Sequence, residues 1–355
     1  MFTGLKNQKL RKIKHQNFFN MNIIIPMAGR GSRLRPHTLT TPKPLISFAG
    51  KSIVQRLVED IVNVCNEKIN EIAFIVGDFG EQVENDLINI ASSLGAKGQI
   101  VYQDQPLGTA HAILCARKSL KGNVVVAFAD TLFKADFKLD KNHDGIIWVN
   151  KIDDPSAFGV VKINEEKVIT DFVEKPVEFV SDLAIIGIYY FKSGENLEKE
   201  LQYLIDNDIK DKGEYQLTNA LENMKNKGLS FTTGEVDEWL DCGNKDATLY
   251  TCERVLDHHK NLNLIDNEAE ILETEIIEPC YIGPGVIIQN STIGPNVSIG
   301  SGTKILNSKI EGSIIQENTN IDNAKLAKSM IGNNVYYNGK NISQEVSIGD
   351  FCEIK

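Results

Sequence analysis

The sequence predicts an α/β domain built on a doubly wound, mainly parallel sheet, followed by a parallel β-helix of hexapeptide repeats. Two patterns carry this prediction. In the first two-thirds of the chain, short β-branched apolar runs alternate with segments of helical periodicity. After about residue 270, isoleucines recur every six residues and several of them precede glycine. The length of 355 residues is sufficient for two domains.

The alternating elements of the first part follow the order expected of βαβ units. The expected strands are 23–26, 72–76, 124–129 and 146–150, and the expected helices are 52–63, 82–90 and 110–120. Ligands of such sheets bind at the carboxyl ends of the strands. The loop after Ile25 and the turn at Asp130 are therefore expected to lie close to a binding site.

The β-helix prediction rests on isoleucines that stay in phase over several repeats. These are Ile276, Ile282 and Ile288, then Ile293, Ile299 and Ile305, and finally Ile342, Ile348 and Ile354. The positions of Ile276, Ile293 and Ile310 also differ by seventeen. A generic β segment rich in isoleucine and glycine does not require such fixed spacing, whereas each short strand of a β-helix contributes one inward aliphatic residue.

The expected organisation has four parts. Residues 1–20 are basic and are expected to form a disordered extension, with Met21 as the natural first residue. Residues 21–250 form the α/β domain, 251–270 a helical linker and 271–355 the β-helix. In the linker, His258 and His259 are adjacent on a helix and point apart, so a solvated pair is expected there rather than two ligands of one metal.

Composition excludes several classes of protein. The net charge of −10 argues against general binding to nucleic acid or to an anionic membrane. The six cysteines show no metal-type spacing, which is typical of reduced thiols in a cytosolic protein. No apolar run reaches the length of a membrane span. The expected compartment is the cytoplasm.

A loop with glycines and cations follows the first expected strand. Gly29 and Gly31 allow backbone N–H groups to approach phosphate oxygens, and Arg33 and Lys43 can neutralise them. A dinucleotide fingerprint would need glycine where Leu34 stands, and a Walker loop ending at 51–52 would need glycine at position 45, where leucine stands. The glycines alone leave a plain strand-to-helix turn with solvated charges as an equal alternative.

The full loop is more specific than its glycines. Its residues Gly29, Gly31, Ser32, Arg33, Leu34, Pro36, Pro42 and Lys43 resemble the opening motif of the sugar-1-phosphate nucleotidyltransferases. The resemblance extends to about residue 250. It implies a Rossmann-like domain of the nucleotide-diphospho-sugar transferase type and a left-handed β-helix with three hexapeptides per coil. It also implies these nucleotide-binding residues: Ala28, Gly29, Gly31, Ser32, Arg33, Lys43, Gln103, Gly108 and Thr109.

The chemistry of this family requires cations and carboxylates rather than a catalytic triad. A sugar 1-phosphate is already an anion, so its attack on the α-phosphorus of a nucleotide needs alignment and charge neutralisation but no general base. Asp130 and Asp241 match the two metal-binding aspartates of the family, which predicts Mg²⁺ as the cofactor. Alone, either aspartate would be read as a turn cap. Ala129 departs from the glycine often found before the first aspartate.

A second group of motifs resembles the sugar-phosphate site. By this match Glu174 binds sugar hydroxyls, Lys175 holds the sugar phosphate, and Gly159 and Gly187 line the sugar site. The expected catalytic residues are Arg33, Lys43, Asp130 and Lys175.

The substrates that the resemblance favours are dTTP and glucose 1-phosphate. The stretch 214–218 resembles the segment that precedes a helix near the sugar in thymidylyl- and uridylyltransferases. This resemblance favours a pyrimidine nucleotide and a gluco-configured sugar. A uridylyltransferase acting on glucose 1-phosphate and a guanylyltransferase acting on mannose 1-phosphate remain alternatives.

Two alternatives concern the role of the second domain and of the chain as a whole. Some relatives pair the catalytic domain with a β-helix acetyltransferase that uses a histidine base, but no histidine follows His259 here. We therefore expect the β-helix to act in assembly or regulation, with a homo-oligomer formed through β-helix contacts. A catalytically silent regulatory homologue is the alternative from another class of protein, and it would be expected to lack some of the cations or carboxylates.

Overall fold

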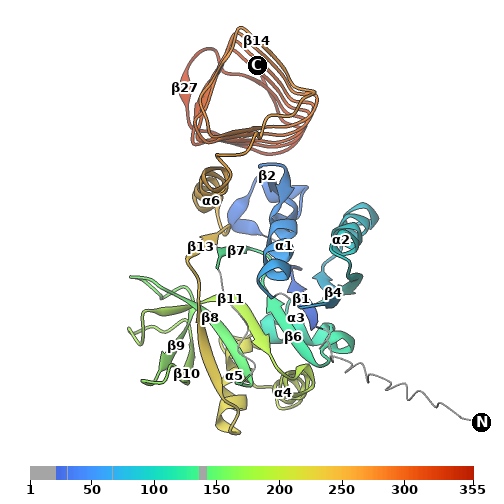
Figure 1. The fold of residues 1–355 in the computed structure, drawn as a ribbon, viewed down its shortest axis with the longest axis vertical. Coiled ribbons are helices and arrows are strands. Elements are labelled where there is room, and N and C mark those ends of the chain that lie inside the picture. The colour runs from blue at the N-terminus through green and yellow to red at the C-terminus, as the bar shows by residue number, and fades with distance from the viewer. Residues whose placement is uncertain (1–20, 30, 66, 136–141) are drawn as a thin grey trace, which may run out of the picture.

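The computed structural model describes residues 21–29, 31–65, 67–135 and 142–355. It consists of an α/β domain and a prism of short strands with a triangular cross-section (Figure 1). The extension expected at 1–20 lies outside the described residues. None of the helices in the described part is long and apolar enough to cross a membrane.

A nine-stranded sheet forms the centre of the α/β domain. Along it the order is β10-β9-β11-β6-β1-β4-β5, and β8 joins β12 to β11. The strands are β1 (Met21–Pro26), β4 (Ile69–Val76), β5 (Lys97–Tyr102), β6 (Asn123–Ala127), β8 (Gly145–Lys151), β9 (Gly159–Ile163), β10 (Ile169–Glu174), β11 (Leu183–Phe191) and β12 (Phe231–Glu235). The strands β6, β1, β4 and β5 are parallel, as expected, whereas β11 is antiparallel to both β6 and β8. The sheet is therefore mixed.

Helices cover both faces of this sheet. They are α1 (Ile53–Cys65), α2 (Glu81–Ser93), α3 (Thr109–Cys115), α4 (Gly194–Asp206) and α5 (Leu217–Asn226), and a further helix, α6 (Lys245–His258), lies beneath the prism. Successive side chains of a strand point to opposite faces. Accordingly, Ile23 and Ile25 belong to the core shared with α1 and α2, and Ile24 belongs to the core shared with α3, α4 and α5. This alternation makes the domain doubly wound, as predicted.

Two short sheets lie outside the central one. β7 (Thr131–Lys134) pairs antiparallel with β13 (Glu238–Asp241), and β2 (Ser47–Phe48) pairs with β3 (Lys51–Ser52). The helix expected at 110–120 is divided, because α3 ends at Cys115 and a 3₁₀ turn, Arg117–Ser119, follows. The helix α6 begins at Lys245 and so crosses the expected boundary at residue 250.

Three parallel sheets form the C-terminal prism, which is consistent with a left-handed β-helix. The first sheet contains β14 (Glu270–Leu272), β17 (Ile287–Gln289), β20 (Lys304–Leu306), β23 (Asn320–Asp322), β26 (Tyr336–Asn338) and β29 (Glu353–Ile354). The second contains β15 (Glu275–Ile276), β18 (Thr292–Ile293), β21 (Lys309–Glu311), β24 (Lys325–Ala327) and β27 (Ser343–Gln344). The third contains β16 (Cys280–Ile282), β19 (Val297–Ile299), β22 (Ile314–Ile315), β25 (Met330–Ile331) and β28 (Ser347–Ile348).

The six-residue period correctly identified the inward residues of the early coils. Ile276, Ile293 and Ile310 occupy equivalent positions on adjacent strands, as their spacing of seventeen predicts. Ile342 was wrongly assigned to this set. It lies outside the strands and is 55% exposed, and Gln344 takes the place opposite Leu326. Gln344 comes seven positions after the inward Tyr337, whereas Leu326 comes five positions after Ile321, so the chain has two additional residues there, which shift the phase of the pattern.

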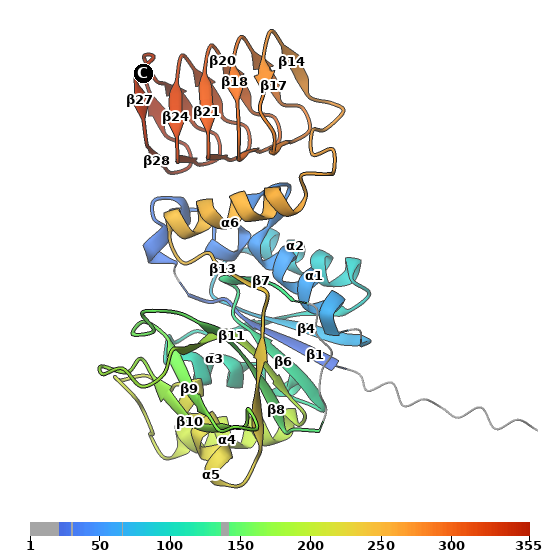
Figure 2. The same cartoon turned by 60° about the vertical axis from the view of Figure 1, so that its left-hand side comes forward.

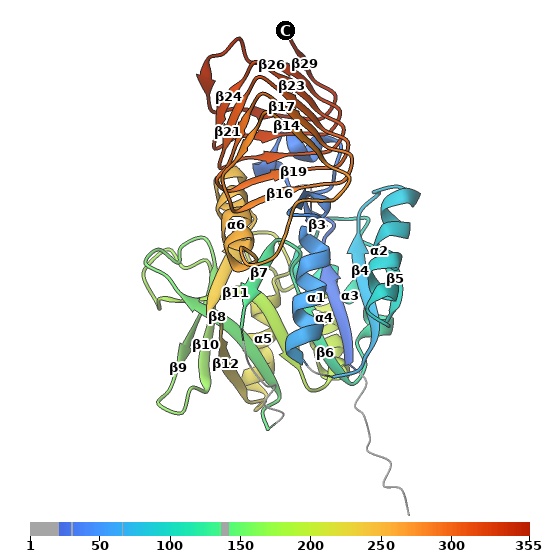
Figure 3. The ribbon, with the colours of Figure 1, turned by 45° about the horizontal axis from the view of Figure 1, so that its top comes forward.

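One outward row of the prism packs against the α/β domain. The row runs along the third sheet through Tyr281, Ser298, Ile314, Met330 and Ser347, which pair with one another in that order. Ile314 and Met330 are buried in the same hydrophobic core as α1. Figure 2 shows the prism stacked above the α/β domain with α6 beneath it, and Figure 3 shows the same stacking from a raised view.

Candidate active site

Two adjoining pockets lie along the carboxyl ends of β1 and β6, with volumes of about 380 and 290 Å³. The first pocket is bounded by the glycine loop and the start of α3. The second is bounded by β11, β10 and β13. Both are lined by Arg33, Thr109, Phe128, Asp130 and Glu214.

Every residue that was assigned a catalytic, binding or metal-holding role from the sequence lines at least one of the two pockets. The first pocket contains Ala28, Gly29, Gly31, Ser32, Arg33, Lys43, Gln103, Gly108 and Thr109. The second contains Gly159, Glu174, Lys175, Gly187 and Asp241. Asp130 lines both. The structure thus brings the residues together, while their individual roles remain predictions.

The glycine loop is folded tightly on itself. Gly31 has a φ of +60°, and a Cβ atom there would lie 2.8 Å from the Cβ of Lys43. The hydroxyl of Thr38 donates a hydrogen bond to the carbonyl oxygen of Gly31 at 2.8 Å. A side chain at position 31 would therefore strain the backbone and displace Lys43.

Two carboxylates and a lysine meet where the pockets join. Lys43 Nζ lies 2.7 Å from Asp130 Oδ2. Asp130 directly precedes β7 and Asp241 ends β13, and Thr131 and Asp241 are paired across these strands. Burial raises the pKa of Asp241, and the charge of Asp130 raises it further, whereas the Gly243 N–H and the charges of Lys43 and Arg33 lower it. Paired carboxylates of this kind attract a cation.

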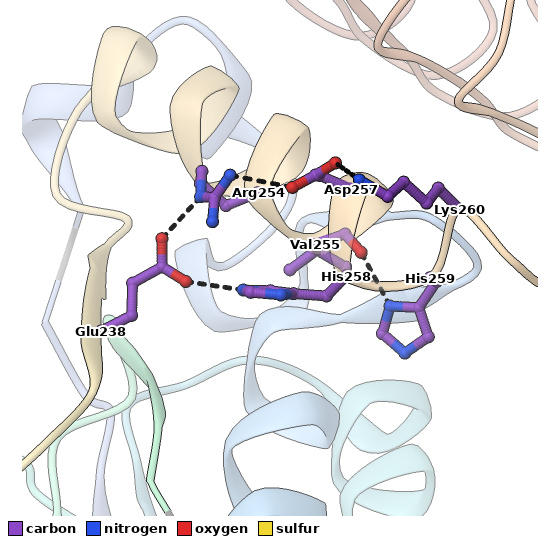
Figure 4. A network of polar contacts seen from close by, with 7 residues as sticks. All are labelled: Glu238, Arg254, Val255, Asp257, His258, His259 and Lys260. Atoms are coloured by element: carbon purple, nitrogen blue, oxygen red, sulfur yellow. Dashed lines mark hydrogen bonds and ion pairs between the residues drawn. The ribbon is translucent and has the colours of Figure 1, made fainter.

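β13, the strand that carries Asp241, is bound to α6 at both ends, and Figure 4 shows the end at Glu238. Glu238, at the start of β13, accepts hydrogen bonds from Arg254 Nε and His258 Nε2, each at 2.6 Å. At the other end, the Thr251 hydroxyl donates to the carbonyl oxygen of Asp241 at 2.8 Å. These three hydrogen bonds fix β13, and with it the backbone of Asp241, relative to α6.

His258, the last residue of α6, and His259, which follows it, point apart, as expected. His258 reaches Glu238, whereas His259 Nδ1 lies 2.7 Å from the carbonyl oxygen of Val255 on α6 (Figure 4).

The far end of the first pocket presents an amide. Gln103 Nε2 donates to His111 Nδ1 at 3.2 Å and to the carbonyl oxygen of Gly108 at 3.4 Å. Burial lowers the pKa of His111, which favours the neutral imidazole whose Nδ1 accepts this bond. Among the described residues no donor occupies Gln103 Oε1, so this oxygen is available to a ligand.

The segment 214–218 connects the two pockets. Gly108 has a φ of +108°, and a Cβ there would lie 2.5 Å from the carbonyl oxygen of Tyr215. Tyr215 also exchanges backbone hydrogen bonds with Leu107 and Ala110, each at 2.9 Å. The hydroxyl of Thr109 donates to Gln216 Oε1 at 3.1 Å. Close approach of these two chain segments requires glycine at position 108.

The second pocket holds an acid and a base from the end of β10. Glu174 Oε2 accepts a hydrogen bond from the hydroxyl of Thr218 at 3.0 Å, and Glu174 Oε1 lies 3.6 Å from Lys175 Nζ. The Lys175 side chain is 50% exposed, which leaves its ammonium group accessible to a ligand. Gly187 has a φ of +87° and lies opposite Phe128.

Several residues of the site were not assigned a role from the sequence. Glu214 and Phe128 line both pockets, and Trp239 lines the second, where it packs edge-to-face on Phe158 with ring centroids 5.1 Å apart. Thr218 orients Glu174. Glu214 and Thr218 belong to the stretch 214–218 already singled out from the sequence, whereas Phe128 and Trp239 are distant from it in the chain. Only the fold reveals that these four residues line one pocket.

The pair Asp130 and Asp241 fits a divalent hard cation. Within the described residues no group of three or more His, Cys, Asp or Glu side chains is placed to hold a metal. Mg²⁺ does not need one, since it commonly uses one or two carboxylates together with substrate phosphates and water. The two aspartates therefore form a suitable half-site for this ion.

Comparison with known proteins agrees with this geometry. Residues 22–258 match the family model described as nucleotidyl transferase. The bifunctional protein GlmU of Methanococcus vannielii is 28% identical over 93% of this chain and 82% of the relative. A glucose-1-phosphate thymidylyltransferase of Streptomyces antibioticus is 28% identical over 89% of this chain and 93% of the relative.

A solved structure supports the fold. The crystal structure of a putative glucose-1-phosphate thymidylyltransferase from Bacillus anthracis aligns with a TM-score of 0.56 and 24% identity, covering 65% of this chain and 93% of that chain. The family model spans the sheet, both pockets and α6. The chain therefore belongs to the nucleotidyl transferase family.

Proposed function

We propose that the protein transfers a thymidylyl group from dTTP to glucose 1-phosphate, which yields dTDP-glucose and pyrophosphate. Sugar-1-phosphate nucleotidyl transfer is the activity that the family and the paired pockets support. The first pocket would receive the triphosphate and the second the sugar phosphate. The proposal goes beyond this general activity by specifying dTTP as the nucleotide and glucose 1-phosphate as the acceptor.

The observation that carries the proposal is the position of Asp130. It lines both pockets and pairs with Lys43 at 2.7 Å, so the cation that would bind the triphosphate and the carboxylate that would bind a metal are in contact. Two anionic substrates that must react with each other require such charges at their point of contact.

In the proposed reaction a phosphate oxygen of the sugar phosphate attacks the α-phosphorus of dTTP. A P–O bond forms there, the bond to the β-phosphate oxygen breaks, and pyrophosphate leaves with the electron pair. Arg33 and Lys43 would neutralise the triphosphate, and Lys175 would hold the attacking phosphate. Asp130 and Asp241 would hold a divalent metal, which screens the charge on both substrates.

The Gln103 amide favours binding of bases that present an N–H donor. Its free Oε1 accepts from the N3–H of thymine or uracil, or from the N1–H of guanine. Cytosine and adenine present an acceptor at the corresponding edge and are disfavoured. Uridylyl transfer to glucose 1-phosphate and guanylyl transfer to mannose 1-phosphate are therefore the alternatives to test.

A silent regulatory homologue is the less favoured alternative. Loss of catalysis would be expected to leave gaps among the charged residues, yet Arg33, Lys43, Asp130, Lys175 and Asp241 all line the pockets. A β-helix acetyltransferase with a histidine base is also disfavoured, because residues 260–355 contain no histidine.

The test is a matrix of dTTP, UTP, GTP, CTP and ATP against glucose 1-phosphate and mannose 1-phosphate, with Mg²⁺ and a pyrophosphate assay. We expect the highest kcat/KM for dTTP with glucose 1-phosphate. A higher value for another pair would replace the proposed substrates and keep the reaction. Absence of pyrophosphate from every pair would favour the silent homologue.

A further inference from the structure

The outward row of the third β-helix sheet lies against the chain segment that follows the glycine loop. Ser298 Oγ accepts a hydrogen bond from the backbone N–H of Ala49 at 2.8 Å. Gln316 Nε2 donates to the carbonyl oxygen of Ser47 at 2.9 Å. The β-helix thus forms hydrogen bonds to the stretch that connects the loop to α1.

The last described coil extends this contact to the loop itself. Asp350 Oδ2 accepts hydrogen bonds from the hydroxyls of Thr40 at 2.5 Å and Thr41 at 3.2 Å. Next to it, His37 Nε2 lies 3.0 Å from Ser347 Oγ. A Cβ atom on Gly349 would lie 3.0 Å from the Cβ of Pro36, so the two backbones approach closely. Four positions of the loop region, 36, 37, 40 and 41, therefore meet one coil.

Asp350 itself is held firmly. Its Oδ1 accepts a hydrogen bond from the backbone N–H of Asn333 at 2.7 Å, and its Oδ2 one from Asn333 Nδ2 at 3.3 Å. Hydrogen bonds to an ionised acceptor are stronger than those between neutral groups. The carboxylate is fixed to the neighbouring coil and presents its Oδ2 to the loop.

Two short connections lead from this contact to the first pocket. Thr41 precedes Lys43 by one proline, whose ring restricts φ and makes the step stiff. Thr38, three residues before Thr41, donates to the carbonyl oxygen of Gly31, and Gly31 packs on Lys43. A displacement of 36–41 would therefore move both Gly31 and Lys43.

We propose that Asp350 of the β-helix is a positioning residue for the nucleotide pocket: by holding Thr40 and Thr41, it fixes the loop that carries Lys43. The inference rests on the proposed function, because it assigns Lys43 to the triphosphate. It gives the β-helix a role in substrate binding within one chain. Asp350 acts on the substrates through the loop and does not contact them directly.

The test is a double-mutant cycle between Asp350→Asn on the β-helix and Thr40→Val with Thr41→Val on the loop. The loop variant removes both donors and leaves the bonds between Asp350 and Asn333 in place. For each change we expect KM for dTTP to rise about three- to tenfold, which is the net contribution of one ordinary hydrogen bond, because the change reaches Lys43 only through the loop. KM for glucose 1-phosphate should stay unchanged. The combined variant should show little more than either change alone.

Asp322→Asn is the matched control. Asp322 is also a β-helix aspartate whose Oδ1 accepts from an asparagine of the neighbouring coil, Asn307, at 3.0 Å. In the described part of the chain, its hydrogen bonds stay within the β-helix. The KM of the Asp322→Asn variant for dTTP should equal that of the wild type. Thermal unfolding of all variants separates positioning from loss of folded protein.

Additive effects in the cycle, or equal rises of KM for both substrates, would overturn the inference. Isothermal titration calorimetry with dTTP, UTP and GTP distinguishes failure of the positioning role of Asp350 from failure of the proposed function. If the wild type binds one of these nucleotides but releases no pyrophosphate, the proposed function is refuted. The positioning role then still predicts that Asp350→Asn weakens nucleotide binding. If Asp350→Asn and the loop variant bind the nucleotide as tightly as the wild type, the positioning role is refuted.

Discussion

Lys43 and Asp130 form an ion pair at 2.7 Å between the end of the glycine loop and the end of β6. The lysine side chain is 11% exposed and the aspartate side chain 34% exposed, so the pair is partly shielded from water. Partial burial strengthens the electrostatic coupling between such groups. The pair thereby joins the expected triphosphate site to the expected metal site.

Replacement of Asp130 by asparagine should reduce kcat by about a hundredfold or more, because a neutral amide is a weak ligand for Mg²⁺ and leaves Lys43 without its counter-charge. Pyrophosphate release at saturating substrates measures this. Asp182→Asn is the control, since Asp182 pairs with Lys151 outside both pockets. An Asp130→Asn enzyme with more than about a tenth of the wild-type kcat would contradict the assignment.

Replacement of Gln103 by leucine should lower discrimination between bases. The shape is retained but the acceptor is lost, so kcat/KM for dTTP should fall about ten- to a hundredfold and that for CTP much less. Competition assays with the two nucleotides give this ratio. Gln82→Leu serves as control, because Gln82 is exposed on α2 and bonds Asp86. Equal losses for both bases would show that Gln103 does not read the base.

Replacement of Lys175 by alanine should raise KM for the sugar phosphate about ten- to a hundredfold and leave KM for the nucleotide nearly unchanged. The reason is that Lys175 lines the second pocket and not the first. Initial rates with each substrate varied in turn resolve the two constants. Lys162→Ala, an exposed change on β9, should alter neither. A selective rise of KM for the nucleotide would reverse the assignment of the pockets.

The buried His37 should make the protein less stable in acid. Burial, with a smaller contribution from the charge of Lys245, lowers the pKa of His37 to about 4, and the charge of Asp350 opposes this shift. Between about pH 6.5 and pH 4 the unfolded chain binds a proton that the folded chain does not. The free energy of unfolding therefore falls as the pH decreases through this range, by on the order of 3 kcal/mol.

Urea unfolding at pH 7 and pH 4.5 measures this effect. In His37→Gln the loss between the two pH values should be smaller than in the wild type. His143→Gln is the matched control, since His143 Nδ1 also lies near a serine hydroxyl, that of Ser230 at 3.3 Å. An unchanged pH dependence in His37→Gln would exclude His37 as its source.

Motifs and periodicity predicted much of this structure. The glycine loop, Asp130 and Lys175 were identified because each lies in a short contiguous motif, and the coils because isoleucine repeats at a fixed interval. The antiparallel direction of β11 was not predicted, since strand direction depends on pairing between distant segments. Ile342 was misassigned because two additional residues between Tyr337 and Gln344 move the isoleucine out of the inward position.

The contact between the domains left a signal that the sequence analysis overlooked. Along the third sheet the inward position is always isoleucine, and the preceding outward position is polar or aromatic in three coils. In the two middle coils it is instead Ile314 or Met330, and these apolar side chains are buried in the hydrophobic core that also contains α1. An apolar residue at an outward position of a β-helix is the pattern that marks such a buried face.

Because successive coils contact the α/β domain one after another, the number of coils determines how much of its surface the β-helix covers. Adjacent strands are separated by about 4.8 Å, so the four steps from Tyr281 to Ser347 cover about 19 Å of the α/β domain. Loss of one coil would withdraw Asp350 by one step, beyond hydrogen-bonding reach of Thr40. The number of coils is thus matched to the length of the surface beneath them, and insertion or deletion of a repeat would alter the nucleotide pocket without changing a residue that lines it.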